Sequence, residues 1–335
     1  MKEKGVFVIT SVYHILIAIL LIEQKNLRDS ILVIVKLTPN IDTLVEPLKK
    51  SPWFTDVKLM MGRSEQKRLL GKFAYKFNRK NVVTLIDKTI DLSGIDNTIT
   101  DFDFYMASPD SAKQYFLYKY KKSTFFMLED GTKTYLDLEP NVLKKIGHSI
   151  LNKPLNNGYD KRFTKVYATN PSGLPPILKE KGALLNWRET FKQLPQEKKE
   201  LLLDIFLGGN KSVTQTLLNT NKTKSIVVTQ PLSEDKKMES EVEKIKIYTD
   251  FIESCKTDVV YLKPHPREKT DYHTVFKGQD HVVILEQLFP VELLNGIPGL
   301  QFESGFTVFS SSLDHLNVKH KVNLGLDYFR EHYAK

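Results

Sequence analysis

The acidic motif Glu129-Asp130-Gly131 directly follows the apolar run TFFML (124–128). Two neighbouring carboxylates at the end of a strand repel each other, so one of them can be tuned to act as a general base near neutral pH. Gly131 permits a tight turn and the close approach of a ligand. Asp-Gly is also a common turn pair, and the motif on its own is better explained as an acidic turn.

A second stretch with chemical potential is YLKPHPRE (261–268), which places His265 between two prolines after an apolar run. Each proline fixes its own φ and pushes the preceding residue towards an extended conformation, so the stretch is a stiff exit from a strand. Lys263 and Arg267 flank the imidazole with positive charge, which suits the binding and protonation of an anionic leaving group. A rigid turn with an exposed histidine explains the same residues equally well.

Two further stretches suit parts of a nucleotide. In FTVFSSSLDHL (306–316) a predicted strand runs into Ser310, Ser311 and Ser312 and then a helix. Serines at a helix N-terminus can bind phosphate, although serine is also simply a good N-cap. Glu292 in LFPVELLNGIPG (288–299) can accept both hydroxyls of a ribose, or it can lie on a solvated helix face.

A metal site and a membrane-binding segment are weaker hypotheses. Asp101 and Asp103 form an Asp-x-Asp pattern of the kind that holds divalent metals, but no neighbouring cluster completes a ligand set, so we expect no metal site. The stretch 63–81 has an apolar stripe of Leu69, Phe73 and Phe77 at helical spacing. Its basic residues are Arg63, Lys67, Arg68, Lys72, Lys76, Arg79 and Lys80. Such a helix can rest on anionic lipid headgroups or pack its stripe against the core, and both can hold at once.

The elements that must position these residues alternate between apolar runs and helix-like stretches, which predicts an α/β fold with parallel sheets. A first series of strands is predicted at 5–10, 30–37, 56–61, 97–107, 124–128 and 165–169. A second series is predicted at 225–230, 258–266, 281–286 and 301–312. We therefore predict a domain over 1–175, a helical connection over 176–224, a second domain over 225–320 and a final helix over 321–335.

Composition narrows the classes of protein further. The 335 residues include 49 Lys and Arg against 40 Asp and Glu, and the formal charge of +9 favours anionic partners such as nucleotides or an acidic membrane surface. Cys255 is the only cysteine, so we expect a buried thiol, no internal disulfide and a reducing, cytoplasmic compartment. The apolar N-terminus is interrupted by Thr10 and Ser11, which predicts a strand at 6–10, a polar turn at 11–14 and a helix from Ile15 rather than a membrane span or export signal.

Several common functional signatures are missing from the sequence. It contains no Gly-x-Gly-x-x-Gly motif after the first strand, no Walker loop, no Gly-x-Ser-x-Gly elbow and no zinc signature. Nucleic acid binding has only the bulk charge in its favour, and no nucleic acid partner is expected.

The order of the motifs carries more information than any one of them. Glu129-Asp130-Gly131, then His265-Pro266, then Ser310-Ser311-Ser312 resembles the bacterial sialyltransferases, whose members share an acidic-acidic-Gly motif, a His-Pro motif and a later Ser motif. The stretches VVTQPLSED (227–235) and KPHPR (263–267) are most similar to glycosyltransferase family 52. That family includes lipooligosaccharide and capsular α-2,3-sialyltransferases and also members that transfer other sugars.

The resemblance implies a GT-B fold, in which two Rossmann-like domains face each other across a cleft, with the acceptor mainly on the first and CMP-sialic acid on the second. It implies inverting transfer of sialic acid to a terminal galactose of a bacterial surface glycan, with α-2,3 as the expected linkage and with no cofactor or obligatory metal. The acceptor would be an oligosaccharide, a glycolipid or a capsule repeat. The resemblance leaves open whether the protein makes peripheral contact with an anionic membrane and whether it forms a homodimer.

The resemblance also implies roles for particular residues. Asp130 is the expected general base, with Glu129 as its substitute, and His265 stabilises or protonates the departing phosphate. Glu292 holds the ribose. The other residues that we place with the donor are Gly131, Lys263, Pro266, Ser310, Ser311 and Ser312. Tyr13 and His14 are weaker candidates for contact with the acceptor, and a share of His14 or His148 in the acid role stays open.

Two other functions remain as alternatives. One is a GT-B transferase that uses another nucleotide sugar, and the other is a non-catalytic protein of the same fold that binds anions or a membrane.

Overall fold

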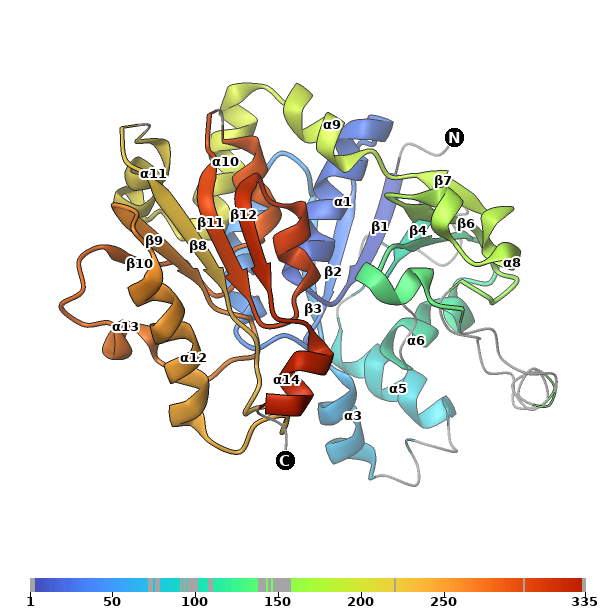
Figure 1. Cartoon of the computed structure of the whole chain (residues 1–335). Helices are drawn as coiled ribbons and strands as arrows, with labels where there is room; N and C mark the ends of the chain where they lie inside the picture. Colours follow the sequence, from blue (N-terminus) through green and yellow to red (C-terminus); the bar gives the residue numbers. More distant parts are fainter. Residues whose placement is uncertain are drawn as a thin grey trace. The chain divides into compact units, whose positions relative to one another are not determined.

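The computed structural model describes residues 4–71, 75, 79–90, 92, 95, 102–107, 111–137, 143, 146, 158–219, 221–297 and 299–332. It divides the chain into two compact units, Met1–Gln193 and Leu194–Lys335 (Figure 1). The boundary lies within the stretch 176–224, which the sequence predicts as a connection.

The first unit is built on a parallel sheet with the order β3-β2-β1-β4-β5-β6-β7 among its described residues. The strands are β1 (Lys4–Ile9), β2 (Ile31–Val35), β3 (Asp56–Met60), β4 (Phe102–Met106), β5 (Thr124–Leu128), β6 (Phe163–Ala168) and β7 (Gly182–Leu184). Since β1 pairs with both β2 and β4, the direction in which strands are added reverses there. Ligand crevices in doubly wound folds lie at the carboxyl ends of strands beside such a reversal.

Helices connect these strands along the chain. They are α1 (Val12–Lys25), α2 (Val45–Lys49), α3 (Arg63–Leu70), α5 (Arg79–Thr89), α6 (Ser111–Lys119), α8 (Pro176–Lys179) and α9 (Trp187–Gln193), with 3-10 turns η1 (Ile41–Leu44), η2 (Gly131–Tyr135) and η3 (Pro171–Gly173). The strand sequences ILVIV in β2 and FDFYM in β4 are buried throughout, as expected for a sheet covered on both faces.

The N-terminal apolar stretch forms β1 and α1 rather than one long segment. Ser11 is extended and its hydroxyl accepts a hydrogen bond from the backbone N–H of His14, so the helix begins at Val12. The predicted polar turn at 11–14 is therefore wrong, because this cap places Tyr13 and His14 in the first turn of α1. No helix among the described residues is long and apolar enough to cross a membrane.

The second unit holds a parallel sheet with the order β10-β9-β8-β11-β12 among its described residues. The strands are β8 (Lys224–Val228), β9 (Val259–Lys263), β10 (Val282–Ile284), β11 (Phe302–Thr307) and β12 (Val318–Asn323). The helices are α10 (Gln196–Leu207), α11 (Lys211–Leu218), α12 (Glu241–Ser254), α13 (Tyr272–Val275) and α14 (Leu326–His332), with 3-10 turns η4 (Val291–Gly296) and η5 (Ser311–His315). Here the direction reverses at β8, which pairs with β9 and β11.

The predicted α/β class with two Rossmann-like domains is confirmed by these two parallel sheets. Figure 1 colours the first sheet from blue to yellow-green and the second from gold to red. The arrangement of the domains across a cleft stays a prediction.

Several elements differ from the sequence-based expectation. Within the connection predicted as helical over 176–224, α9 and α10 are separate helices, and Pro195 precedes the first residue of α10. The segment predicted as one basic helix over 63–81 contains α3, which ends before Gly71 with its φ of 76°, and α5 from Arg79. Leu69 of the apolar stripe is exposed, whereas Phe73, Phe77, Lys72 and Lys76 lie outside the described residues.

Two features of the second unit also differ from the sequence-based predictions. The helix expected after the serine run is the short 3-10 turn η5, followed by β12. Cys255, expected to be buried, is half-buried because it caps the C-terminus of α12.

Gly62, the N-cap of α3, lies close to the backbone of Lys36, which directly follows β2. A Cβ atom at this position would lie 2.1 Å from the backbone carbonyl oxygen of Lys36, which no side-chain movement can relieve. We expect Gly62→Ala to lower the free energy of unfolding by about 1–3 kcal/mol, the usual cost of overpacking. Arg63→Ala at the next, exposed position is the control in denaturant unfolding; equal stability of the two variants would contradict the packing described.

Candidate functional site

The acidic motif lies at the carboxyl edge of the first sheet. Glu129 follows β5, Thr169 follows β6, and α1 follows β1 after a single turn. Because all these strands are parallel, their following residues gather at one edge. The side chains of α1 thereby reach the acidic motif although they are more than a hundred residues away in the chain.

Glu129 is buried and its carboxylate accepts four hydrogen bonds among the described residues. Oε1 accepts from the Tyr13 hydroxyl at 3.0 Å. Oε2 accepts from the Thr169 backbone N–H at 2.7 Å, from the Thr169 hydroxyl at 2.8 Å and from the Tyr135 hydroxyl. Buried charges need such partners, and hydrogen bonds to a carboxylate are stronger than neutral ones. Glu129 therefore ties α1, η2 and the end of β6 together.

Tyr135 completes this arrangement from η2. Burial and the hydrogen bond to Glu129 raise the pKa of the Tyr135 hydroxyl. It therefore stays a phenol and a donor at neutral pH.

Asp130, in contrast, is a partly exposed carboxylate. Its side chain is 36% exposed, and its Oδ1 lies 3.4 Å from Nε2 of the buried His14. Its backbone N–H donates to the Thr134 hydroxyl at 2.7 Å. Gly131 follows with a φ of +56°, and a Cβ atom there would meet nothing within 4 Å. Asp130 is thus held by its neighbours and remains partly exposed to solvent, as a base that meets a substrate must be.

The proton of His14 can be assigned from its neighbours. Nε2 lies 3.2 Å from the Glu129 carbonyl oxygen and near the Asp130 carboxylate, and both of these groups are acceptors. Nδ1 lies 2.9 Å from the Ser11 hydroxyl, which can donate. Nε2 therefore carries a proton and donates towards the acidic motif. The structure brings the predicted residues Tyr13, His14, Glu129 and Asp130 together; acceptor binding by the first two stays a prediction.

His265 follows β9 at the carboxyl edge of the second sheet. Its backbone N–H donates to the Thr229 hydroxyl at 3.1 Å and to Oε2 of Glu268 at 2.7 Å. Its ring Nδ1 accepts from the Arg267 backbone N–H at 3.1 Å. Burial, with smaller contributions from the positive charges of Arg267 and Lys263, lowers the pKa of His265 to about 4. The imidazole is therefore neutral over the physiological pH range.

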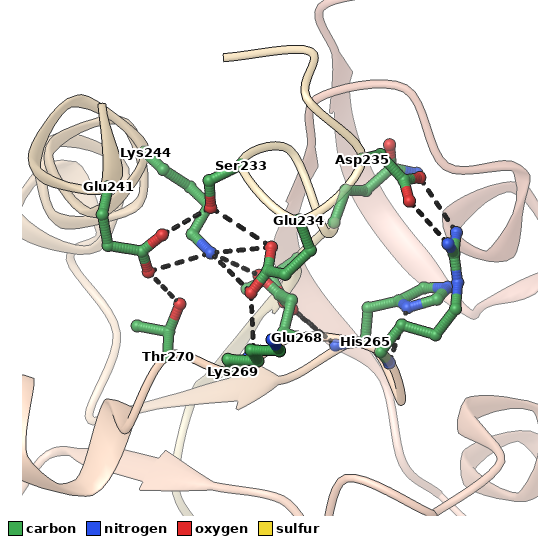
Figure 2. A network of polar contacts seen from close by, with 12 residues as sticks. Ser233, Glu234, Asp235, Glu241, Lys244, His265, Glu268, Lys269 and Thr270 are labelled. Atoms are coloured by element: carbon green, nitrogen blue, oxygen red, sulfur yellow. Dashed lines mark hydrogen bonds and ion pairs between the residues drawn. The ribbon is translucent and has the colours of Figure 1, made fainter. Parts of the chain in front are cut away.

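A buried ionic network lies under the His265 backbone, and Figure 2 shows it. The fully buried ammonium of Lys244 on α12 lies 3.0 Å from Glu241, 3.2 Å from Glu234 and 3.7 Å from Glu268. Glu268 also accepts from the Tyr272 hydroxyl at 2.8 Å and from Thr229. Burial raises the pKa of Glu268, against the opposing effect of these bonds. The network holds the loop after β8 and the loop after β9 to α12.

The predicted donor residues occupy different environments. Lys263 is buried, its ammonium donates to the carbonyl oxygens of Pro264 and Gln287, and burial lowers its pKa to about 8. Glu292 is buried in η4, where desolvation raises its pKa.

Ser310 accepts from the Ser312 backbone N–H at 3.2 Å and caps η5. Among the described side chains, Ser310 and His265 do not hydrogen-bond to each other. The side chain of Ser311 and the residues His148 and Asp101 lie outside those described.

The carboxylates of the first sheet do not form a metal site among the described residues, and the second unit contains a polar cavity. Among the described residues, no group of three or more His, Cys, Asp or Glu side chains could hold a metal ion. Asp103 is buried on β4. A cavity of about 450 Å³ in the second unit is lined by polar side chains that include Ser233, Glu234, Glu241, Lys269, Thr270 and Asp271. Glu234 and Glu241 face Lys244 as well, so the cavity adjoins the network of Figure 2.

The supporting residues Thr169, Thr229, Glu268 and Lys244 are not singled out by the sequence analysis. Thr229 does lie in the stretch VVTQPLSED (227–235), which carries part of the family resemblance, and Glu268 directly follows KPHPR (263–267). Lys244 and Thr169 carry no comparable signal.

Comparison with known proteins gives one family and distant structures. The model of glycosyltransferase family 52 matches residues 47–326. An uncharacterized protein of Haemophilus influenzae is 33% identical over 193 residues, which are 57% of this chain and 59% of that protein. The chain therefore matches less than two thirds of that relative's length.

Among solved structures, S. aureus MnaA with UDP has a TM-score of 0.46 and 12% identity, covering 93% of this chain and 75% of that one. The UDP-GlcNAc 2-epimerase of Methanocaldococcus jannaschii has a TM-score of 0.44 and 11% identity, covering 98% and 91%. The fold described above follows from the sheet order and does not depend on these likenesses.

The two carboxylates of the acidic motif should differ in their effect on stability. Glu129→Gln replaces a carboxylate oxygen by an amide donor that faces existing donors, and should lower the free energy of unfolding by about 1.5–3 kcal/mol. Asp130→Asn keeps an oxygen for His14 and should change it by less than about 0.5 kcal/mol. Urea unfolding of both variants measures this, and a larger loss for Asp130→Asn would refute the assignment of Glu129 as the anchoring residue.

The buried ammonium of Lys244 can be tested against an exposed lysine on the same helix. Lys244→Met leaves buried carboxylates without their cation and should cost about 3–5 kcal/mol. Lys246→Met removes an exposed pair with Asp250 and should cost about 0.3–0.5 kcal/mol. Similar midpoints for the two variants in thermal or urea unfolding would contradict the network.

Proposed function

The chain belongs to glycosyltransferase family 52, and from this premise we propose that it is an inverting sialyltransferase. It transfers sialic acid from CMP-sialic acid to a terminal galactose of a bacterial surface glycan, with α-2,3 as the proposed linkage. The observation that carries the proposal is the pair of unlike carboxylates after β5, where Asp130 is accessible and Glu129 is saturated with hydrogen bonds.

Asp130 is the proposed general base. It removes the proton from the galactose hydroxyl while that oxygen attacks the anomeric carbon of the sialyl group, on the side opposite to the departing phosphate. The configuration at the anomeric carbon is thereby inverted. Glu129 would have to give up bonds to Tyr13, Tyr135 and Thr169 before it could do the same, which supports Asp130 as the base.

His14 has a supporting role in this proposal. Its Nε2–H points towards the Asp130 carboxylate and the Glu129 carbonyl oxygen, so it orients the base rather than the acceptor. The Tyr13 hydroxyl donates its proton to Glu129, so Tyr13 can contact the acceptor through its ring or as a hydrogen-bond acceptor.

The donor is proposed to bind along the carboxyl edge of the second sheet. His265 contacts the phosphate, the Ser310 and Ser311 hydroxyls assist it, and Glu292 holds the ribose. Lys263, Pro266 and Ser312 shape the site, and Lys263 contributes through its charge and through the carbonyl groups that it holds. Gly131, beside Asp130 in the first unit, is proposed to leave room for the donor. A base, a cationic environment and correct orientation suffice for a phosphate leaving group, so the proposed mechanism does not use a metal ion.

The proposed activity also implies a location and partners for the enzyme. We propose that the enzyme works in the cytoplasm and caps a galactose-terminated oligosaccharide, glycolipid or capsule repeat. Peripheral membrane contact would use the basic residues of α3, of which Arg68 is 76% exposed.

The direct assay mixes the protein with CMP-sialic acid and lactose, with and without a chelator. We expect release of CMP and formation of sialyl-lactose at equal rates in both samples. A chelator that stops transfer would contradict the metal-free mechanism. Tighter binding of UDP than of CMP in a calorimetric titration would shift the donor to another nucleotide sugar.

Replacement of the base separates catalysis from binding. Asp130→Ala should lower kcat about 100- to 10,000-fold, the usual contribution of a general base, while the Kd for CMP changes little. Glu46→Ala, at a position on α2 that is 72% exposed, is the control and should keep full activity. Wild-type turnover in Asp130→Ala would exclude it as the base, and CMP binding without turnover in the wild type would favour the non-catalytic alternative.

A further inference from the structure

The strand order of the second sheet reverses at β8, and the two loops that flank this point are joined by one contact. β8 pairs with β9 on one side and with β11 on the other. Ligands of doubly wound folds bind outside the carboxyl ends of the strands at such a reversal. Lys237 lies in the loop after β8, and its ammonium is 4.3 Å from the centroid of the Phe309 ring in the loop after β11. A cation is therefore held where this kind of fold receives its ligands.

The backbone around Lys237 is fixed by local hydrogen bonds. The Lys237 N–H donates to the Leu232 carbonyl oxygen at 2.8 Å, and the Met238 N–H donates to the same oxygen at 3.1 Å. Leu232 and Met238 are both buried in the core of the second unit. The preceding residue, Lys236, turns the chain with a φ of 56°. The exposed side chain of Lys237 thus starts from a backbone that is held on both sides.

The aromatic ring under the ammonium is held as well. Phe309 packs against the core and meets Phe329 of α14 edge to face, with ring centroids 5.5 Å apart. The face of such a ring attracts a cation. It occupies one side of the ammonium, which has three N–H donors. Among the described residues, no oxygen accepts a hydrogen bond from the Lys237 ammonium, so its donors can serve a ligand.

The charge of Lys237 is also not used in an ion pair with a described residue. Asp235 is the carboxylate in the same loop, and both of its oxygens bind the guanidinium of Arg267, at 2.5 Å and 2.9 Å. The hydrogen bond from Arg267 lowers the pKa of Asp235, and the charge of Lys237 adds a smaller effect. Arg267 is thereby neutralised by Asp235, whereas Lys237 keeps a positive charge that an anionic ligand can meet.

The ring connects Lys237 to the serines that are proposed to contact the donor phosphate. Phe309 directly precedes Ser310, whose N–H donates to the Thr307 hydroxyl at 3.2 Å and whose side chain caps η5. The ammonium therefore lies beside the proposed phosphate site. In a CMP-sialic acid donor, the phosphate oxygen and the carboxylate are attached to the same anomeric carbon. A residue beside the phosphate site can thus reach the carboxylate, which needs a partner when it leaves water.

We propose that Lys237 binds the carboxylate of the sialyl group and thereby selects a donor with an acidic sugar. The inference rests on the proposed function, in which the donor lies along this edge of the sheet. Lys237 takes no part in making or breaking bonds. Its pairing with the carboxylate exists before and during transfer, so its loss should raise the KM for the donor and leave kcat almost unchanged.

Replacement of the ammonium by an apolar group tests the pairing. Lys237→Met should raise the KM for CMP-sialic acid about 10- to 100-fold, the range expected for a hydrogen bond between charged groups. The Kd for CMP in a calorimetric titration should stay near that of the wild type, because CMP lacks the carboxylate. Lys237→Arg keeps a cation that can bind a carboxylate and should retain most of the affinity.

Lys236→Met is the matched control, since it removes an exposed positive charge from the neighbouring position. It should keep the KM of the wild type for the donor. An equal loss of CMP affinity and donor affinity in Lys237→Met would place the ammonium on the phosphate and overturn the proposal. An unchanged KM in that variant would overturn it as well.

A donor analogue separates this inference from the proposed function. The methyl ester of CMP-sialic acid keeps the phosphate and lacks the negative charge on the sugar. As a competitive inhibitor it should bind equally well to the wild type and to Lys237→Met. Absence of sialyl transfer by the wild type would refute the proposed function, while calorimetric titration of the donor and its ester without an acceptor would still test Lys237. Active wild type with the same donor affinity in Lys237→Met would refute the inference alone.

Discussion

A buried carboxylate that must satisfy all its hydrogen-bonding capacity is the constraint on which the site depends. Glu129 meets it by binding Tyr13 from α1, Tyr135 from η2 and Thr169 after β6. An unsatisfied buried carboxylate would cost several kcal/mol, so these elements are held in register with the end of β5. Asp130, the next residue, is consequently turned towards solvent and His14.

The second unit also contains a buried glutamate that is held by hydrogen bonds. Glu268 is buried and binds the backbone of His265, three residues earlier, together with Thr229 and Tyr272. In both units a buried glutamate fixes the chain near a partly exposed residue, Asp130 in the first unit and His265 in the second. Asp130 and His265, the two residues with proposed roles in transfer, are thereby oriented by packing and by hydrogen bonds of their neighbours, as a preorganised site requires.

The sequence predicts much of the fold because the signals are local. The apolar runs at 31–35, 124–128 and 259–263 are buried strands, and polar motifs at their ends lie at the carboxyl edges of parallel sheets. It misses β12, whose sequence VKHKVN is mostly exposed at the edge of the second sheet and lacks an apolar run. The helix break at Pro195 and the start of α1 at Val12 depend on single residues at the helix N-termini, which apolar periodicity does not reveal.

The division of roles within the acidic motif is beyond sequence patterns of this kind. Glu129 and Asp130 are neighbours with the same chemistry, and only the folded chain brings Tyr13, 116 residues away, to one of them. The same holds for Lys244, which reaches Glu268 from the first turn of α12. Motif order indicated the family, whereas burial and hydrogen bonding distinguish the anchoring carboxylate from the accessible one.

The central claim is that Asp130, and not Glu129, is the carboxylate that meets the acceptor. A crystal structure of the protein with lactose bound measures it, through the distances from the galactose hydroxyl to each carboxylate. We predict an Asp130 oxygen within hydrogen-bonding distance of that hydroxyl, about 2.6–3.2 Å, with Glu129 still bound to Tyr13 and Thr169. A Glu129 carboxylate that has left those partners and lies closer to the hydroxyl than Asp130 would contradict the account.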